Sequence, residues 1–272
     1  MGRVEKKAAE LEQNPVVARF ASAGHLVNGV VHALIGALAV GVAFGLGGSA
    51  DQQGAMRAIR STPFGVVVLW VAAVALFALA IYSIAGGITV LRRKTTAGVK
   101  ELGKAIGYAV VGSLALTYAL GGSSDGDAAP KTLSARLLAT GWGSVVLFGA
   151  AAVVLGVGVA LIVGGIRQRF LRDVDLRGMS RRVFTVLGTL GHVAKGISIG
   201  AIGALLMVAV LRHNPDDAAG LDGSLKRLVE LPFGPVLLVL IGVGLVLYGC
   251  FCFARARTVV RRAGQANGSG HG

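Results

Sequence analysis

Histidine and asparagine side chains occur at helical spacing within the first long apolar stretch of this sequence. His25, Asn28 and His32 follow one another at i, i+3 and i+7, so a helix would place them on one face, together with Gly29 and Gly36. Asparagine both donates and accepts hydrogen bonds, and neutral histidine does the same through its two ring nitrogens. The stripe therefore has the residue types of a polar packing face or of a buried binding site.

A second stripe, centred on a lysine, lies in a later apolar stretch. Ser198 flanks it, three residues after Lys195. A lysine deep in a membrane costs about 2.5–3.5 kcal/mol, so such a residue is a functional candidate by default. A third stripe begins at Tyr108 and is mostly apolar. The positions of the lysine stripe, in the order of the first stripe, are His192, Lys195, Gly196, Ile199 and Gly203.

Two interpretations of the polar residues remain open. In the first, the stripes are packing faces, on which glycine permits close approach and polar groups form interhelical hydrogen bonds of about 0.6 kcal/mol each. In the second, a cluster of Asn28, His32, Lys195 and Ser198 lines a polar cavity within the membrane. We expect the two polar stripes to face each other, which would place Asn28 and His32 near Lys195 and Ile199, because facing lipid would be costly.

Three further residues are expected at the boundary between the apolar stretches and water. They are His25, Tyr108 and His192, each near the start of its stretch. Each ring has an apolar body and a polar tip, which suits an interfacial position. We therefore expect interfacial anchoring from these residues.

Catalytic and cofactor signatures are missing from the sequence. The short glycine runs lack the Lys-Ser/Thr of a phosphate-binding loop, and no His-Glu-x-x-His or Cys-x-x-Cys occurs. All the acidic residues are assigned to connections or to the N-terminal segment, which argues against a proton-coupled pump. We expect no catalytic residues, no metal site and no cofactor.

Composition identifies the elements that carry these residues as membrane helices. The chain is 54% hydrophobic and 15% charged, whereas a soluble domain has about 25% charged residues. A membrane helix needs about 20 apolar residues, and six stretches reach or approach that length. The sequence thus predicts an all-α polytopic membrane protein with six transmembrane helices. The stretches are Phe20–Leu46, Phe64–Leu91, Ala105–Leu120, Ser144–Ile166, Val183–Leu211 and Phe233–Ala254.

Positive charge alternates between the connections. Most of the 27 Lys and Arg residues lie in the N-terminal segment, the 92–104 and 167–182 connections and the C-terminal segment. Such an excess marks the cytoplasmic side. The pattern predicts a multi-pass protein of the cell membrane with both termini in the cytoplasm. The same residues are expected to contact anionic lipid headgroups. Because they occur in short runs between apolar stretches, nucleic acid is not expected as a partner of this chain of net charge +14.

Two markers recur three times along the chain. The first is Gly-[His/Tyr]-x-x-x-Gly, which begins at Gly24, Gly107 and Gly191. The second is Pro63-Phe64-Gly65, with its counterparts Gly141-Trp142-Gly143 and Pro232-Phe233-Gly234. Before each second marker, an apolar-basic stretch predicts a short interfacial helix. The expected organisation is an N-terminal cytoplasmic segment 1–18, two-helix repeats 19–94, 95–170 and 171–256, and a flexible cytoplasmic tail 257–272.

These markers resemble a bacterial family, common in actinobacteria, that is catalogued as domain-of-unknown-function family 1206. The resemblance covers about residues 18–256 and implies three tandem two-helix repeats in a membrane. It implies no activity and no functional residues. That family often has Tyr after the first glycine and Arg before the second, whereas here Asn28, Val111 and Lys195 occupy the basic position.

The function expected from the sequence is a non-enzymatic structural or interaction role in the cell membrane. The alternative is a small transporter or channel with a polar intramembrane cluster from the first and fifth transmembrane helices. Repeats and polar stripes favour the alternative, whereas the absence of proline from the spans disfavours it, because transporters often use broken helices.

Overall fold

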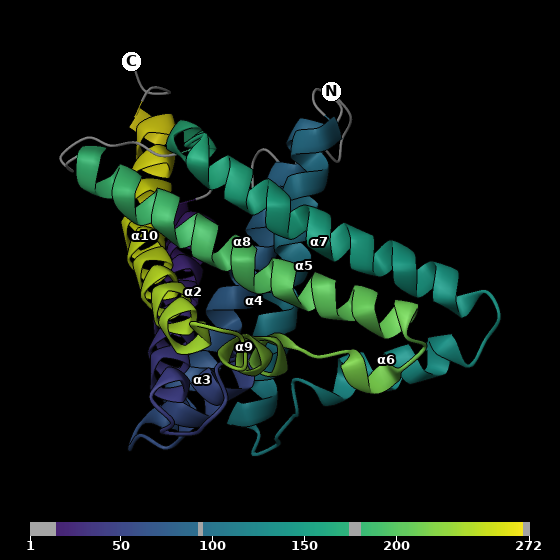
Figure 1. Cartoon of the computed structure of the whole chain (residues 1–272). Coiled ribbons are helices and arrows are strands. Elements are labelled where there is room, and N and C mark those ends of the chain that lie inside the picture. The colour runs from purple at the N-terminus through teal and green to yellow at the C-terminus, as the bar shows by residue number, and fades with distance from the viewer. Residues whose placement is uncertain (1–14, 92–94, 174–180, 269–272) are drawn as a thin grey trace.

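The computed structural model describes residues 15–91, 95–173 and 181–268, and the described residues form helices and their connections without a strand. Six long helices form three consecutive pairs, and one short helix lies between the two members of each pair, as the hydropathy pattern predicts (Figure 1). The elements are α2 (Pro15–Ala43), α3 (Gln52–Arg60), α4 (Gly65–Leu91), α5 (Thr95–Ala119), α6 (Ala128–Leu138), α7 (Gly143–Ile166), the 3-10 turn η1 (Arg169–Asp173), α8 (Arg181–Leu211), η2 (Pro215–Asp217), α9 (Leu221–Val229) and α10 (Gly234–Gly268).

Six of these helices are long and apolar enough to cross a membrane. The prediction of an all-α fold with six transmembrane helices is therefore confirmed. The spans within them are Ser22–Ala43, Gly65–Leu91, Ala97–Ala119, Gly143–Ile166, Arg181–Leu211 and Gly234–Arg257.

The third span differs from its sequence-based bounds. It was expected to begin at Ala105, but α5 begins at Thr95, so most of the 92–104 connection is helical. Glu101 consequently lies within a span, where no carboxylate was expected. Its Oε1 accepts from Lys104 Nζ at 2.5 Å, one turn further along the helix. This local pairing lets a short polar helix end extend the apolar stretch, which is too short alone.

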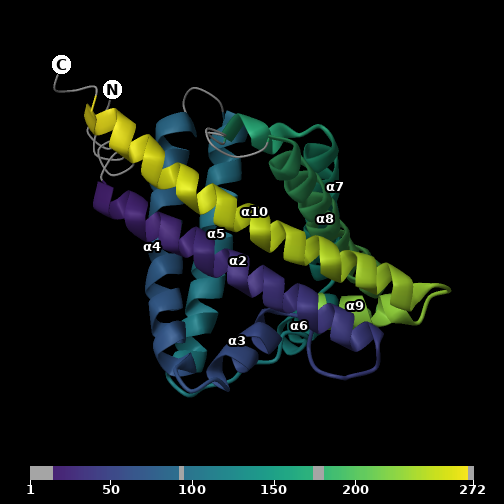
Figure 2. The same cartoon turned by 90° about the vertical axis from the view of Figure 1, so that its left-hand side faces the viewer.

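The strongest packing joins helices of different repeats. The last helix, α10, runs beside the first, α2, while α4 packs on α5 and α7 packs on α8. Figure 2 shows α2 and α10 side by side across the upright α4 and α5, with α7 and α8 beyond them. Each repeat thus packs one helix against each of the other two repeats. Among the described residues α5 and α7 do not pack on each other, so the long helices follow the open order α5, α4, α2, α10, α8, α7.

Glycine determines how closely α2 and α10 approach. A Cβ built on Gly36 would collide with the main-chain oxygen of Gly242, and one on Gly249 would lie 2.6 Å from the oxygen of Gly29. Such small residues allow backbones to touch where no hydrophobic effect drives association. The same device recurs between α7 and α8, where a Cβ on Gly158 would lie 2.8 Å from the oxygen of Gly196.

All three short helices lie on one side of the molecule, opposite the two ends of the chain (Figures 1 and 2). We call this side the short-helix face and the opposite side the terminal face. Each short helix leads through a tight turn into a long one, and the main-chain N–H of Gly65 donates to Thr62 O at 2.9 Å. A Cβ on Gly65, Gly143 or Gly234 would collide with the last turn of the preceding short helix. This close approach explains why the second marker ends in glycine in every repeat.

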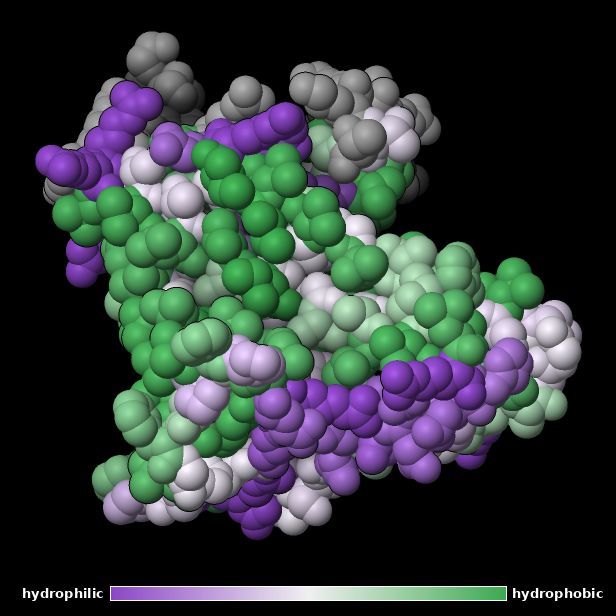
Figure 3. Space-filling model, viewed as in Figure 1, coloured by the Kyte–Doolittle hydropathy of each residue, from purple (hydrophilic) through white to green (hydrophobic). Residues whose placement is uncertain are grey.

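The surface shows the hydropathy expected of a membrane protein. In Figure 3 a hydrophobic band lies between hydrophilic side chains at the terminal face and over α6 and α9. The marker aromatics Phe64, Trp142 and Phe233 are 76%, 68% and 85% exposed, directly before the long helices begin. They therefore lie at the short-helix face, in the register that the repeat predicts.

The C-terminal segment differs from its expectation. Residues 257–272 were expected to be a flexible tail, but α10 continues as a helix to Gly268. Most of the expected N-terminal segment 1–18, the basic run Arg92-Arg93-Lys94 and His271 lie outside the described residues.

Candidate functional site

The polar stripe of the first span faces α10. The Nδ2 group of Asn28 donates to Cys252 Sγ at 3.3 Å, and both residues are buried. One turn along α2, His32 Nδ1 donates to the main-chain oxygen of Asn28 at 2.8 Å, which fixes the tautomer of the ring. The His32 ring packs against the Tyr248 ring, with 4.8 Å between their centroids.

Lys195 reaches the same tyrosine from α8. Its Nζ donates to Tyr248 OH at 3.2 Å and lies 4.3 Å from the centroid of the Tyr248 ring. A cation over an aromatic face is stabilised by the ring quadrupole, most strongly when it is desolvated. Ser198 is 2% exposed, and its hydroxyl donates to the oxygen of Ala194 within α8. The Ser198 hydroxyl therefore bonds within its own helix and not to the other polar residues of the cluster.

The two polar stripes are brought together through α10 rather than directly. Tyr248 contacts both His32 and Lys195, so the two stripes that were expected to face each other share a partner on α10. Ile199 is partly buried and makes no polar contribution. The sequence prediction included neither Tyr248 nor Cys252 in the cluster, although their i, i+4 spacing in the last stretch marks one polar face.

The three residues expected at the interface differ from one another in burial. His192 is partly buried in an aromatic cluster, stacked on Phe170 with 5.0 Å between ring centroids. His25 is only 4% exposed, so its ring does not reach the surface as expected. It is oriented edge-on to Tyr108, which is partly buried, at a centroid distance of 6.2 Å. Neighbouring helices cover the His25 ring, and the spacing of residues in the sequence does not show which helices will be neighbours.

The intramembrane cluster offers hydrogen bonds, one lysine and the Cys252 thiol. In the part of the chain that the structure describes, no group of three or more His, Cys, Asp or Glu side chains is placed to hold a metal ion. The described side chains of the cluster are matched mainly to one another. Its geometry suits cohesion of the helices, or binding of a small polar group.

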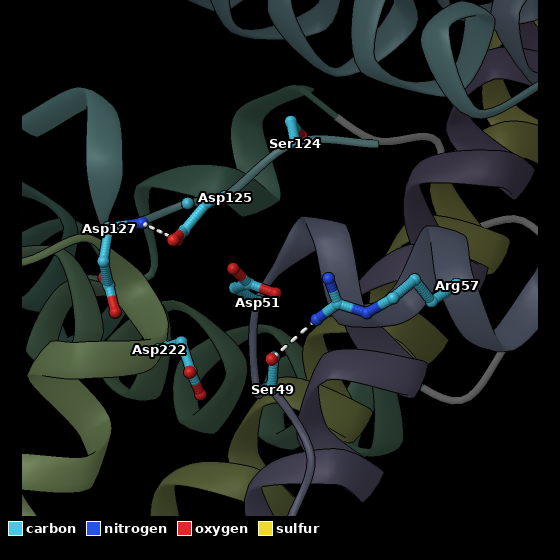
Figure 4. Close-up of a pocket in the computed structure, with 8 residues that line it drawn as sticks. Ser49, Asp51, Arg57, Ser124, Asp125, Asp127 and Asp222 are labelled. Carbon is cyan, nitrogen blue, oxygen red and sulfur yellow. Dashed lines mark hydrogen bonds between the residues drawn. The ribbon is translucent and has the colours of Figure 1, made fainter. Parts of the chain in front are cut away.

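A second cluster, which the sequence interpretation did not predict, lies on the short-helix face. It surrounds a cavity of about 400 Å³ that we call the acidic pocket (Figure 4). Ser49, Ser124 and Arg57 also line it. Figure 4 shows Asp51 between the other three carboxylates on one side and Arg57 on the other. The carboxylates come from all three repeats and are Asp51, Asp125, Asp127 and Asp222.

Hydrogen bonds from main-chain N–H groups to aspartate side chains cross the repeat boundaries and build this pocket. Asp127 Oδ1 accepts from the N–H groups of Gly220 and Gly223 at 2.7 and 3.3 Å, at the start of α9. Asp222 Oδ1 in turn accepts from Ala50 N at 2.8 Å, just before α3. Carboxylates at helix starts satisfy unpaired N–H groups and complement the helix dipole. An aspartate of the second repeat thus caps α9 of the third repeat, and an aspartate of the third repeat accepts a hydrogen bond from the first.

Asp51 is the most enclosed carboxylate of the pocket, at 3% exposure. Its Oδ1 accepts from Gly54 N at 2.7 Å and caps α3. Burial raises the pKa of Asp51; the Gly54 N–H opposes the rise, and the nearby Asp222 carboxylate adds to it. Burial and the neighbouring like charge thus make ionisation of Asp51 less favourable than in water. The signal in the sequence was an aspartate after Gly-Gly-Ser in the first two short-helix loops.

Comparison with known proteins supports the assignment of the repeats. The family model described as Domain of Unknown Function (DUF1206) matches residues 23–90, 99–168 and 190–259. A similar protein from Bacillus subtilis (strain 168), Uncharacterized protein YxxB, is 28% identical over 90% of this chain and 92% of its own length. No solved structure matches. With three matched segments that cover most of its length, the chain belongs to the DUF1206 family, as its repeated markers predicted.

Proposed function

We propose that this membrane protein is non-enzymatic and has a structural or interaction role in the cell membrane. The observation that carries the proposal is the close packing of helix pairs between repeats, in which α2 and α10 touch through Gly29, Gly36, Gly242 and Gly249. Backbones in contact over several turns form an interface that a rocking transport cycle would have to separate. The long helices are also continuous, without the unwound centres that many transporters use.

The surroundings of Lys195 support the same role. Its ammonium group is engaged by the ring and hydroxyl of Tyr248, inside a helix interface. The carboxylate that shares a span, Glu101, is paired with Lys104 on its own helix. A lysine held by an aromatic ring contributes to packing without requiring a transported ion.

The proposed orientation places both termini in the cytoplasm. The terminal face carries basic residues at the ends of α5, α7, α8 and α10, whereas the aspartates of the acidic pocket lie on the short-helix face. Membrane insertion places the side that is richer in Lys and Arg in the cytoplasm, and the aspartates contribute little to this choice. Anionic headgroups of the inner leaflet are the proposed partners of Arg167, Arg181 and Arg182, at about 1 kcal/mol per residue.

A small transporter or channel is the second candidate. It is favoured by one observation: polar side chains of three helices, Asn28 and His32 of α2, Lys195 of α8 and Tyr248 of α10, converge at one place. Ionisable side chains inside a membrane commonly mark substrate pathways.

Replacing Lys195 with leucine distinguishes the two candidates. In a deletion strain screened for a growth phenotype, a structural protein carrying Lys195→Leu should accumulate normally and restore growth, because only a costly charge is lost. Its midpoint of thermal unfolding should be unchanged or higher. Normal accumulation without restored growth would instead favour the transporter. Tyr248→Phe is the matched control, since it removes the hydroxyl that receives the lysine N–H and keeps the ring.

A further inference from the structure

We propose that side chains of α2, α5 and α10 near the terminal face bind the phosphate group of an anionic phospholipid. We call the place where they meet the His25 crevice; its residues are His25, Lys104, Tyr108 and Arg255. The inference goes beyond the proposed structural role and holds whichever side of the membrane the terminal face occupies. It rests on polar groups without partners, on an excess of positive charge and on the depth of the crevice in the membrane.

His25 is enclosed by neighbouring helices but has no hydrogen bond. The residue is 4% exposed, and among the described residues no hydrogen bond reaches its ring. Its nitrogens do not occur among the fully enclosed, unpartnered atoms of the described side chains, so they reach an opening in the packing. Because buried polar groups are nearly always hydrogen-bonded, this exception calls for a partner from outside the chain.

Tyr108 reaches the same opening from α5. Its ring meets the His25 ring edge-on, at a centroid distance of 6.2 Å, although α5 packs on α4 and α3 rather than on α2 or α10. Within the described part of the chain the Tyr108 hydroxyl also has no hydrogen bond. A Cβ on Gly103 or Gly107 would meet no other atom within 4 Å. The surface of α5 beside Tyr108 therefore borders open space.

The charges around the His25 ring are mainly positive. Lys104 and Arg255 both act electrostatically on it, and Arg255 also acts on Tyr108. Glu101 is the only carboxylate within the six spans, and it pairs with Lys104. Two cations against one carboxylate leave an excess of one positive charge, which is costly inside a membrane. The phosphodiester of an anionic lipid, with one negative charge, would offset that excess.

The hydrogen-bonding groups of the crevice also fit a phosphate. Lysine and arginine can only donate hydrogen bonds, and the tyrosine hydroxyl and a neutral histidine ring can each donate one. Phosphate oxygens accept such bonds strongly when the donor is charged. A zwitterionic headgroup would add an ammonium group, which Lys104 and Arg255 would repel. The charges therefore favour an anionic lipid over a zwitterionic one.

The depth of the crevice favours a lipid over a soluble anion. His25 lies in the first turn of the first span, Lys104 in the second turn of the third, and Arg255 in the last turn of the sixth. The start of α5 and the end of α10 both lie at the terminal face (Figure 2). Basic sites between helices at this level are reached by headgroups from within the bilayer, so the acyl chains can remain in the lipid.

The test is native mass spectrometry of the full-length protein, purified in non-ionic detergent and titrated with dioleoylphosphatidylglycerol. We expect one lipid to be retained more tightly than any that follow. Dioleoylphosphatidylcholine should bind at least about tenfold more weakly, because its ammonium group faces the two cations. Equal retention of the two lipids, or displacement of the glycerol lipid by an equal concentration of inorganic phosphate, would overturn the proposal.

Variants locate the lipid in the crevice. Lys104→Gln removes a charge and keeps an amide donor, and it should weaken binding of the anionic lipid about tenfold. Tyr108→Phe keeps the ring but loses the hydroxyl, and it should also weaken binding. Arg182→Gln is the matched control, because it removes an exposed basic side chain of the same face. Equal weakening by Arg182→Gln and Lys104→Gln would refute the site, since it would show general attraction to charge.

A further variant keeps the test decisive where Lys104→Gln does not fold. His25→Phe preserves an aromatic contact with Tyr108 and removes both ring nitrogens, so it should weaken binding of the anionic lipid by a similar factor. Wild-type affinity in the folded crevice variants would contradict the proposal.

Discussion

The intramembrane cluster and the acidic pocket deal with charge in opposite ways. The cluster has one lysine, whose ammonium group is held by the ring and hydroxyl of Tyr248. The pocket gathers four carboxylates where helix N-termini and water are available. In lipid an ionised group is costly, so the cluster is dominated by packing, whereas main-chain N–H groups stabilise the carboxylates of the pocket. We therefore expect added side-chain volume in the interior, and loss of a hydrogen-bond acceptor in the pocket, to lower the free energy of unfolding.

The largest effect is expected from added volume in the interior. In Gly36→Leu the new side chain collides with the α10 backbone at Gly242, and overpacking should destabilise the fold by about 3 kcal/mol. Denaturant unfolding in mixed micelles, followed by circular dichroism, measures the change. The control is Gly41→Leu on the same helix, where a Cβ would meet only Leu46 at 3.9 Å. Equal destabilisation by both variants would show that α2 and α10 do not touch as described.

A lost acceptor in the pocket should have the next largest effect. Asp127→Ala leaves the N–H groups of Gly220 and Gly223 without their carboxylate, at a cost of about 1–2 kcal/mol. The same unfolding assay applies. Asp125→Ala should cost less than about 0.5 kcal/mol, because Asp125 accepts only from Asp127 N in its own loop. A smaller cost for Asp127→Ala than for Asp125→Ala would contradict the capping of one repeat by another.

A lost hydrogen bond in the interior should have a small effect. The interaction between Lys195 and Tyr248 is expected to contribute about 0.6 kcal/mol. A double-mutant cycle of Lys195→Leu and Tyr248→Phe measures this coupling free energy. Coupling of several kcal/mol would mean that the lysine, rather than packing, dominates the cluster.

The smallest effect is a pH dependence that originates at Asp51. Because its pKa is raised in the folded protein, folding favours the protonated carboxyl. Its contribution to stability is therefore complete below the ordinary value of 3.8 and is lost as the pH rises through the folded pKa. The facing charges are Arg57 of α3, Asp125 and Asp127 before α6, and Asp222 and Lys226 of α9. Asp51→Asn should reduce the dependence of the free energy of unfolding on pH in this range. An unchanged dependence would mean that another group causes it.

The sequence predicted the six spans and the short helices because apolar length and amphipathic pattern are local properties. It misplaced the start of the third span at Ala105, because the charged residues Lys100, Glu101 and Lys104 are typical of a loop. In the structure they belong to the first turns of α5. It predicted that His32 and Lys195 lie on buried stripes. Their common partner, Tyr248, is 53 residues from Lys195 along the chain, a separation that no local pattern spans.

The acidic pocket was not predicted, because its residues come from three separate loops and form a site only when the fold brings them together. Asp51, Asp127 and Asp222 are each unremarkable near the start of a short helix. Repeat comparison could have grouped the loops, but not shown that Asp127 reaches Gly220, 93 residues away.

The sequence alone determined the number of spans, the repeat and the family, because hydropathy and spacing act over a few turns of one helix. Only the tertiary structure decided which helices pair. The first and last spans, α2 and α10, pack together because Gly36 and Gly242 allow their backbones to touch. That packing brings His32 of α2 to Tyr248 of α10, which is also the partner of Lys195 of α8. On the short-helix face, hydrogen bonds between repeats bring the aspartates of three loops around one cavity.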